Sequence, residues 1–237
     1  MNDYYYENKN ENFQQALSLC EQVFSHEELL KMLKNGNIPQ KQLAALYFDK
    51  VETVEDASAL LNNLTGCDGK IREAVAYKIH KHVYANENAA LLFADLSPKI
   101  YADASIDINA NICRLVIDIV KKLKMNKEFS INYVNNIVCF TEEAFDKLDK
   151  FIFKDKKYVI NKQLFKLYWC LEALKSFYEF VPEEKLLSIV QKAANQNEYT
   201  IREKAAELII VTSKFPKIKE QLTHDENYYV REALKSS

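Results

Sequence analysis

The chain has 237 residues, and its 32 lysine and arginine side chains against 34 aspartate and glutamate side chains give a formal net charge of −2. A charge this balanced argues against a protein dedicated to nucleic acid, because such proteins usually carry a clear basic excess. With only three glycines and four prolines, the chain has too few turn residues for a β-sandwich or barrel, and too few glycines for a phosphate-cradling loop. We therefore expect an all-α protein.

Residues 1–12 are rich in asparagine and tyrosine without apolar periodicity, which predicts a flexible N-terminal tail. They lack the basic start and the apolar stretch of a signal peptide. Apolar runs such as Leu115–Ile117, which ends at Asp118, are too short to span a bilayer. The cysteines occur singly, so we expect reduced, buried thiols: Cys20, Cys67, Cys113, Cys139 and Cys170. Together these features predict a cytoplasmic protein with no membrane association.

Helix signals follow one another from residue 13 to the C-terminus. Ser25 and Thr53 each precede an acidic residue three positions later, an arrangement that caps a helix N-terminus. Gly36 fits a helix end. Three prolines fit first helical turns, where their missing N–H is no loss: Pro39, Pro98 and Pro182. The signals predict about fourteen helices of 8–20 residues joined by short polar turns.

Residues 151–160 are compatible with a small hairpin or with a helix end followed by a loop. We expect the helix end and loop, because an isolated hairpin is only marginally stable.

Internal similarity is the strongest signal in the sequence. The segment 68–79 recurs at 197–208 and again at 225–234, each time with a polar capping residue, then Ile or Val followed by Arg-Glu, and an alanine on the next turn. Weaker copies follow the same phase. The first apolar residues of the copies lie about 30 to 50 residues apart, as in stacked helical hairpins, with an insertion in the longest interval: Ile38, Ile71, Ile108, Ile160, Ile201 and Val230.

Apolar residues in the copy that begins at Ile71 recur at every fourth position and predict a stripe facing a core: Ile71, Val75, Ile79 and Val83. The small residues Ala74 and Ala205 let neighbouring helices approach closely. A single hairpin cannot bury its apolar side alone, so neighbouring hairpins are expected to stack and share one core.

Arg72, Arg202 and Arg231 occupy the same position in three copies. Arginine near a helix start opposes the helix dipole, so we expect each of them to reach an acidic residue in the adjacent repeat. The three would then form a structural ladder between repeats. Ligand binding is the alternative, although isolated surface arginines are weak evidence for it.

The copies resemble the HEAT-repeat family, through an Asp or Asn cap followed by Val/Ile-Arg-x-x-Ala. The motif is seen best at residues 71–74, 201–205 and 230–233, whereas Asn109 and Asn161 replace the arginine in weaker copies. The resemblance implies a right-handed α-solenoid of stacked helical hairpins. It also implies a single repeat domain over residues 13–237, with about five to six irregular repeats and a final half-repeat at residues 225–237.

Most members of this family are scaffolds or binders without chemistry, and the second helix of each hairpin usually lines a concave surface. The resemblance thus implies a non-catalytic scaffold or adaptor, without a cofactor, that binds a protein partner on this surface. Lysines on the expected second helices point to a partner with an acidic segment, attracted by electrostatic complementarity: Lys147, Lys150, Lys185, Lys192, Lys217 and Lys219.

Signals for catalysis and metal binding are weak. His80 and His82 are two residues apart and do not share a helix face. Glu220 and His224 are four apart and do, but a metal site usually needs three or four ligands. HEAT-type iron hydroxylases are similar in fold but need repeated His-Glu pairs, and this chain has one, at His26, inside an expected helix cap. We therefore expect no metal and no enzymatic activity.

The alternative is a nucleic-acid-binding protein similar to the HEAT-like alkylpurine DNA glycosylases, which use a Trp, Asp and Arg site and a basic groove. The sole tryptophan, Trp169, lies among apolar residues in helical phase, which favours a core or inter-repeat aromatic. A lysine-rich stretch from Lys121 to Lys157 interleaves with aromatic residues, which suits a phosphate-bearing or acidic partner as well as a solvated face. The chain has few arginines for phosphate recognition, so a protein partner is favoured.

Overall fold

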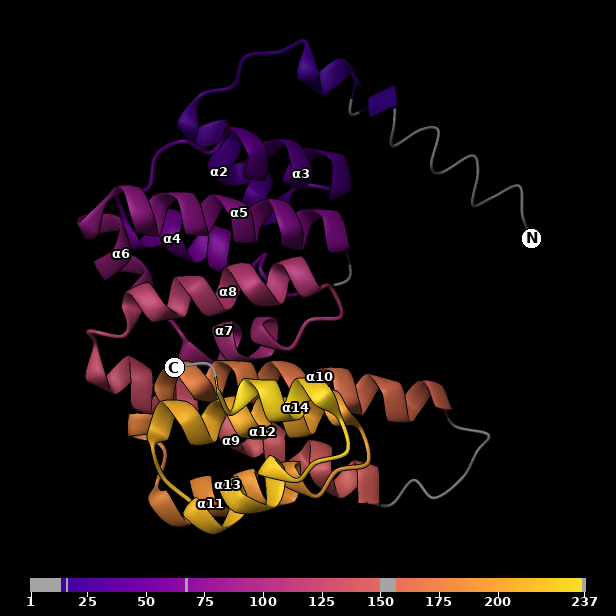
Figure 1. Ribbon diagram of the computed structural model, residues 1–237. Coiled ribbons are helices and arrows are strands. Elements are labelled where there is room, and N and C mark those ends of the chain that lie inside the picture. Colours follow the sequence, from indigo (N-terminus) through magenta and orange to yellow (C-terminus); the bar gives the residue numbers. More distant parts are fainter. Residues whose placement is uncertain (1–13, 16, 67, 150–156, 236–237) are drawn as a thin grey trace. The chain divides into compact units, whose positions relative to one another are not determined.

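A computed structural model describes residues 14–15, 17–66, 68–149 and 157–235 (Figure 1). The described residues form helices and turns and contain no strand, so the fold is all-α, as predicted. They divide into two compact units. The first contains the described residues up to Ala104 and the segment Arg114–Lys124. The second contains the segment Ser105–Cys113 and the described residues from Met125 onward. No helix within these described ranges is both long and apolar enough to cross a membrane.

The first unit arranges alternate helices in two layers. One layer contains α2, α4 and α6, which pack side by side, and the other contains α3 packed against α5. The helices α7 and α8 contribute residues to both units. The bounds are α2 (His26–Asn35), α3 (Ile38–Tyr47), α4 (Val54–Leu61), α5 (Gly69–Ala85), α6 (Glu87–Ala94), α7 (Pro98–Ser105) and α8 (Ala110–Leu123).

The second unit shows the same alternation. The helix α12 packs between α10 and α14, and α11 packs between α9 and α13, so the unit again has two layers (Figure 1). Successive helices join the layers, α9 to α10, α11 to α12 and α13 to α14. The bounds are α9 (Lys127–Asp149), α10 (Lys157–Phe177), the 3-10 helix η2 (Tyr178–Phe180), α11 (Glu183–Ala194), α12 (Tyr199–Thr212), α13 (Pro216–Thr223) and α14 (Tyr228–Ala233).

Local signals set most helix starts as predicted. The hydroxyls of Ser25 and Thr53 each accept a hydrogen bond from the backbone N–H three residues later, and the acidic side chains at those positions bond back to the caps. Gly36 ends α2, where a Cβ atom would lie 2.5 Å from the carbonyl oxygen of Met32. Pro182 is the N-cap of α11 and not part of its first turn, so that position was predicted wrongly by one residue.

The apolar stripe predicted in the first repeat copy is confirmed. Ile71 is 7% exposed, and Val75, Ile79 and Val83 are fully buried. Ala205 is also fully buried, on the helix that packs between α10 and α14, so its small side chain allows the close approach that stacking requires. Ala74 is only half-buried.

The cysteines divide into two kinds. Cys113 and Cys170 are fully buried, and burial raises the pKa of the Cys170 thiol to about 12, as expected for structural thiols. Cys20 and Cys139 are exposed, so their predicted burial is wrong; both lie on helical faces that no neighbouring helix covers. Cys67 lies outside the described residues, as do the predicted tail at 1–12 and residues 151–156, whereas residues 157–160 begin α10.

The three repeated arginines share one contact. Arg72, Arg202 and Arg231 each donate from Nη1 to the carbonyl oxygen six residues earlier, at 2.5, 2.9 and 2.5 Å. These carbonyls belong to Gly66, Gln196 and Asp225. Each arginine thus fastens the turn that precedes its own helix, a role that sequence reasoning missed.

Arg202 also makes a contact of the kind predicted for these arginines, to an acidic residue of the next repeat copy. Its Nε and Nη2 donate to the two carboxylate oxygens of Asp225 at 2.7 and 3.0 Å. Both side chains are at least nine-tenths buried. The guanidinium lowers the pKa of Asp225 below its ordinary value. Asp225 lies between α13 and α14, so this forked ion pair ties α12 to the next hairpin.

Substitution of Arg202 by methionine tests the contact between these hairpins. The substitution leaves the Asp225 carboxylate buried without the guanidinium. We therefore expect the free energy of unfolding to fall by about 2 kcal/mol, a value between those for exposed and buried ion pairs. Hydrogen exchange of the α13 and α14 amides measures the loss locally. Lys235→Ala, which breaks an exposed pair with Glu232, is the control and should change exchange little. Equal protection in both variants would contradict a stabilising role for the Arg202 contact.

Asp56 joins the starts of α2 and α4 in the first unit. Its carboxylate is 2% exposed, accepts backbone hydrogen bonds from Glu52 and Thr53 at 3.1 and 3.0 Å, and lies 2.8 Å from Nε2 of His26. Burial opposes ionisation of the carboxyl group. The hydrogen bonds from Glu52, His26 and Thr53 outweigh burial and lower the pKa of Asp56.

The lowered pKa of Asp56 predicts a loss of stability in acid. Its ionised form stabilises the fold above the ordinary value of 3.8, and this contribution disappears as the pH falls through the folded-state pKa. We expect Asp56→Asn to lower the free energy of unfolding by about 2 kcal/mol at neutral pH and to flatten its decline below about pH 4. Urea unfolding across this range measures both effects. Asp95→Asn, at an exposed position, should keep the wild-type pH profile.

Candidate functional site

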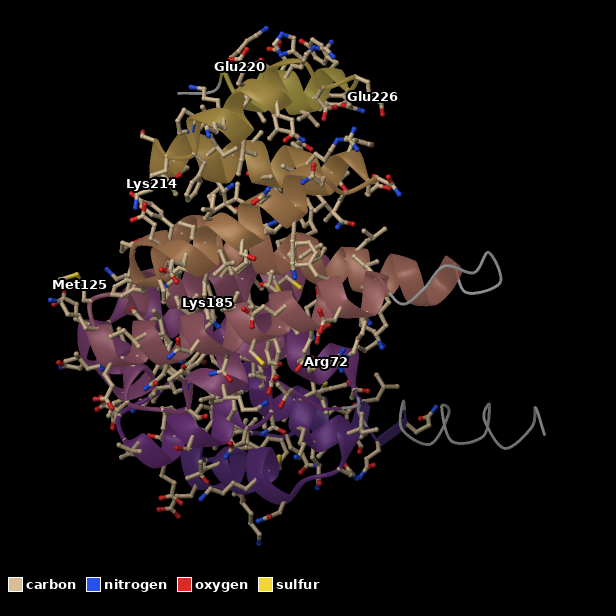
Figure 2. The ribbon with its side chains drawn as sticks, turned by 90° about the horizontal axis from the view of Figure 1, so that it is seen from below. Arg72, Met125, Lys185, Lys214, Glu220 and Glu226 are labelled. Carbon is tan, nitrogen blue, oxygen red and sulfur yellow. The ribbon has the colours of Figure 1, made fainter. Side chains whose placement is uncertain are left out.

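The lysines predicted to bind a partner belong to one layer of the second unit, formed by α9, α11 and α13. Five of them are exposed on this layer: Lys147, Lys185, Lys192, Lys217 and Lys219. Lys150 lies outside the described residues. The helices α11 and α13 run side by side, joined at one end by Lys214 and Glu183 at 3.1 Å and at the other by Gln221 and Asn195 at 3.0 Å. Lys185 and Lys214 both reach the surface in Figure 2.

These lysines differ in how far neighbouring acids neutralise them. Lys147 lies 3.5 Å from Glu143, and Lys185 lies 3.3 Å from Glu142. None of the described acidic residues pairs with the other three, which we call the lysine patch: Lys192, Lys217 and Lys219. Of the predicted lysines that the structure describes, those without an acidic partner therefore lie on α11 and α13, and not on α9.

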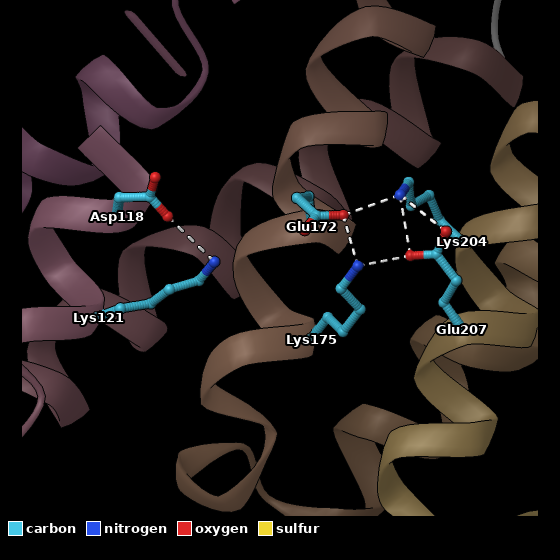
Figure 3. Close-up of polar contacts among 6 residues, drawn as sticks. All are labelled: Asp118, Lys121, Glu172, Lys175, Lys204 and Glu207. Atoms are coloured by element: carbon cyan, nitrogen blue, oxygen red, sulfur yellow. Dashed lines mark hydrogen bonds and ion pairs between the residues drawn. The ribbon is translucent and has the colours of Figure 1, made fainter. Parts of the chain in front are cut away.

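A cluster of four charged side chains holds α10 against α12 (Figure 3). The Nζ atom of Lys204 lies 2.8 Å from Glu172 and 2.9 Å from Glu207, and Lys175 bridges the same two carboxylates at 2.9 and 2.6 Å. The Lys204 side chain is only 8% exposed. Burial favours its neutral form, but the hydrogen bonds to both carboxylates outweigh burial and raise its pKa. The Lys204 charge is therefore held inside the fold, and the half-buried Lys175 is paired at its edge.

Three aromatic rings surround a hollow between α10 and the start of α12. Its volume is about 390 Å³. The ring centroids of Tyr168 and Phe165 lie 5.3 and 6.2 Å from that of Trp169, both in edge-to-face geometry. Trp169 is 8% exposed, in agreement with the aromatic core position expected from sequence, but sequence reasoning missed the hollow. Its lining is Leu164, Phe165, Tyr168, Trp169, Glu198 and Thr200.

A second hollow of about 390 Å³ lies farther along α12, towards α14. Three carboxylates line it, from Glu203, Glu207 and Glu232, together with Lys175 and Tyr229. Burial and the neighbouring Glu207 carboxylate raise the pKa of Glu203. Lys175 pairs with Glu207 and Lys235 pairs with Glu232, each at 2.6 Å, so ion pairs neutralise two of the three carboxylates.

The histidines are placed separately. His26 pairs with Asp56, and His80 stacks on a tyrosine ring at 4.4 Å. His82 is half-buried, its Nε2 lies 3.1 Å from the carbonyl oxygen of Phe48, and burial lowers its pKa. His224 is exposed at the end of α13. Across the part of the chain that the structure describes, no group of three or more His, Cys, Asp or Glu side chains is placed to hold a metal ion.

Comparisons with known proteins give no family for this chain. No protein-family model matches the sequence, and no curated protein matches it. Two crystal structures of engineered proteins from a structural genomics consortium are similar in three dimensions, each with a TM-score of 0.46. Their sequences are 11% and 13% identical to this one, and the matches cover 90% of this chain and 94% and 96% of theirs. A likeness at this level carries no argument about function.

The charged cluster predicts that removing Lys204 strongly lowers the free energy of unfolding. In Lys204→Met, two half-buried carboxylates keep only Lys175 as a partner, so we expect a loss of about 3 kcal/mol in the free energy of unfolding. Urea unfolding followed by circular dichroism measures it. Lys121→Met, which removes the exposed partner of Asp118 (Figure 3), should cost at most about 1 kcal/mol. Similar losses of unfolding free energy in the two variants would contradict the prediction that burial makes the cluster more stabilising than an exposed ion pair.

Proposed function

We propose that the chain is a cytoplasmic, non-catalytic scaffold or adaptor, built as a HEAT-like α-solenoid, that binds a protein partner with an acidic segment. The alternation of layers supports the repeat architecture. In each unit, a helix packs on the helix two positions further along as well as on its immediate neighbour. This is the arrangement that stacked hairpins produce when they share a continuous core.

Polar contacts separated by one repeat give further support. In the first unit, His26 contacts Asp56 at a separation of 30 residues, and Lys78 contacts Asp49 at 29. In the second unit, Lys204 contacts Glu172 at a separation of 32 residues. A stack of hairpins with a period of about 30 to 40 residues places residues one period apart on adjacent helices of the same layer. These separations support the proposed repeat period in each unit.

The lysine patch is the single observation that carries the binding proposal. Its three exposed ammonium groups come from two adjoining helices, and no described carboxylate pairs with them. Each exposed charge pair contributes up to about 1 kcal/mol, so the patch would guide and orient an acidic segment more than bind it tightly. Such binding should weaken with added salt, because exposed charges are screened.

Charge reversal tests the patch. We expect the double variant Lys217→Glu, Lys219→Glu to lose about tenfold or more in affinity for the partner, because two attractions become repulsions. A tagged wild-type chain and this variant are compared in pull-downs from the source cell, read by mass spectrometry, with and without nuclease. Lys31→Glu, at an exposed position on α2, is the matched control and should keep the partners.

The outcomes separate the two functional classes. Partners that survive nuclease, are retained by the control and are lost with the double variant support the scaffold. Loss of the partners after nuclease treatment would contradict the scaffold and support the nucleic-acid-binding alternative. Retention of every partner by the double variant would exclude the lysine patch as the binding surface.

A further inference from the structure

The hollow between α10 and α12 combines an aromatic wall with a carboxylate at its rim. Phe165, Tyr168 and Trp169 form the wall, and Glu198 with Thr200 form the rim at the start of α12. Aromatic faces attract cations through their quadrupole, and a nearby carboxylate adds a direct charge interaction. A hollow of about 390 Å³ is at the small end of ligand sites and suits a single long side chain.

An unsatisfied donor lies in the same wall. The indole N–H of Trp169 is buried and has no hydrogen-bond partner among the described residues. Buried polar groups without partners are rare in native proteins, and each one calls for an explanation. This N–H lies beneath the surface of the aromatic wall, so the contact offered to a ligand is the face or edge of the ring.

The charges around the hollow leave its carboxylate available. Lys204 lies over the Tyr168 ring at 4.8 Å, but its charge is held by Glu172 and Glu207. The hydrogen bonds to Asp225 are the main cause of the raised pKa of Arg202, and Glu198 adds a smaller charge contribution.

Two further lysines on α10 are close in sequence to the lining of the hollow. Lys162 is exposed and makes no ion pair with Glu198 among the described residues. Lys166 lies 3.7 Å from Glu143 and 4.6 Å from the centre of the Phe140 ring, both on α9. The hydrogen bond given to the Glu198 side chain within the described residues comes from the Thr200 hydroxyl, at 3.5 Å. Glu198 therefore has no lysine or arginine within ion-pair distance in the described part of the chain.

We propose that this hollow binds an arginine side chain from a segment of a protein partner, with the guanidinium between the aromatic wall and Glu198. Arginine suits it better than lysine because its planar guanidinium stacks on aromatic rings, is weakly hydrated and offers several donors to a carboxylate. The proposed partner segment contributes an arginine, unlike the acidic segment proposed for the lysine patch.

Trp169 is the sole tryptophan, so its fluorescence reports directly on the hollow. The probe is an acetylated and amidated hexapeptide with one arginine among glycines and serines. Its matched control carries citrulline, which has the same shape without the charge, at that position. We expect a saturable change in Trp169 emission with the arginine peptide and an affinity about tenfold lower for the citrulline peptide, as the loss of a partly desolvated cation implies.

Variants identify the site. We expect Glu198→Gln to weaken binding of the arginine peptide about fivefold through the lost charge, and Phe165→Leu to weaken it several-fold through the lost ring. Glu184→Gln, at an exposed position on α11, should bind as the wild-type chain does. Circular dichroism confirms that each variant is folded, and having two separate variants keeps the test decisive if one of them is not.

Three results would overturn the proposal. The first is no saturable change in Trp169 emission up to about 10 mM peptide, a concentration at which a contact worth a few kcal/mol must appear. The second is an equal response to the arginine and citrulline peptides. The third is unchanged binding by both folded variants. The lysine-patch variant Lys217→Glu, Lys219→Glu should respond to the peptide as the wild-type chain does. This inference therefore stands or falls independently of the acidic partner.

Discussion

The turn before each repeated helix needs hydrogen-bond donors, and this need accounts for the most regular feature of the chain. The accepting residues are exposed at Gly66 and half-buried at Gln196 and Asp225, and a hydrogen bond with a charged donor contributes about 1.5–3 kcal/mol. Arg72, Arg202 and Arg231 meet the requirement by donating to the carbonyl six residues earlier. An arginine at this position is unfavourable to the helix dipole, and the carbonyl contact explains why the pattern nevertheless recurs. Fixing this turn fixes the direction in which the next helix starts, and the stacking of layers depends on that direction.

Within each unit, charged contacts between neighbouring helices complement the apolar core. The buried cluster around Lys204 joins α10 to α12, and the Arg202–Asp225 fork joins α12 to the turn before α14. The fully buried Ala205 lies on the same helix, where a larger side chain would force these neighbours apart. Stability in such a stack is a sum of nearest-neighbour terms. Removing one charged contact should therefore loosen the two helices it joins and leave more distant helices protected.

Local sequence predicted local structure well, and contacts across helices less well. The caps at Ser25 and Thr53 and the stripe from Ile71 to Val83 depend on residues within a few positions of one another. The pairing of Lys204 with Glu172 spans 32 residues and depends on how two helices are rotated, which periodicity does not specify. The exposure of Cys139 and the hollow beside Trp169 depend on the same rotations. One signal in the sequence could have found the pairing, namely opposite charges separated by one repeat.

Two surfaces of the second unit offer opposite charges to a partner. The hollow beside Trp169 has the Glu198 carboxylate at its rim, whereas Lys204 and Arg202 on α12 are both buried in ion pairs. On α11 and α13 the lysine patch remains exposed and unpaired among the described residues. Salt should act unequally on the two surfaces, since it screens exposed lysines strongly and a half-enclosed guanidinium weakly. Under the two proposals, an acidic segment would lie on the lysine patch and an arginine side chain would enter the hollow, so the two partners would occupy different helices of the unit without competition.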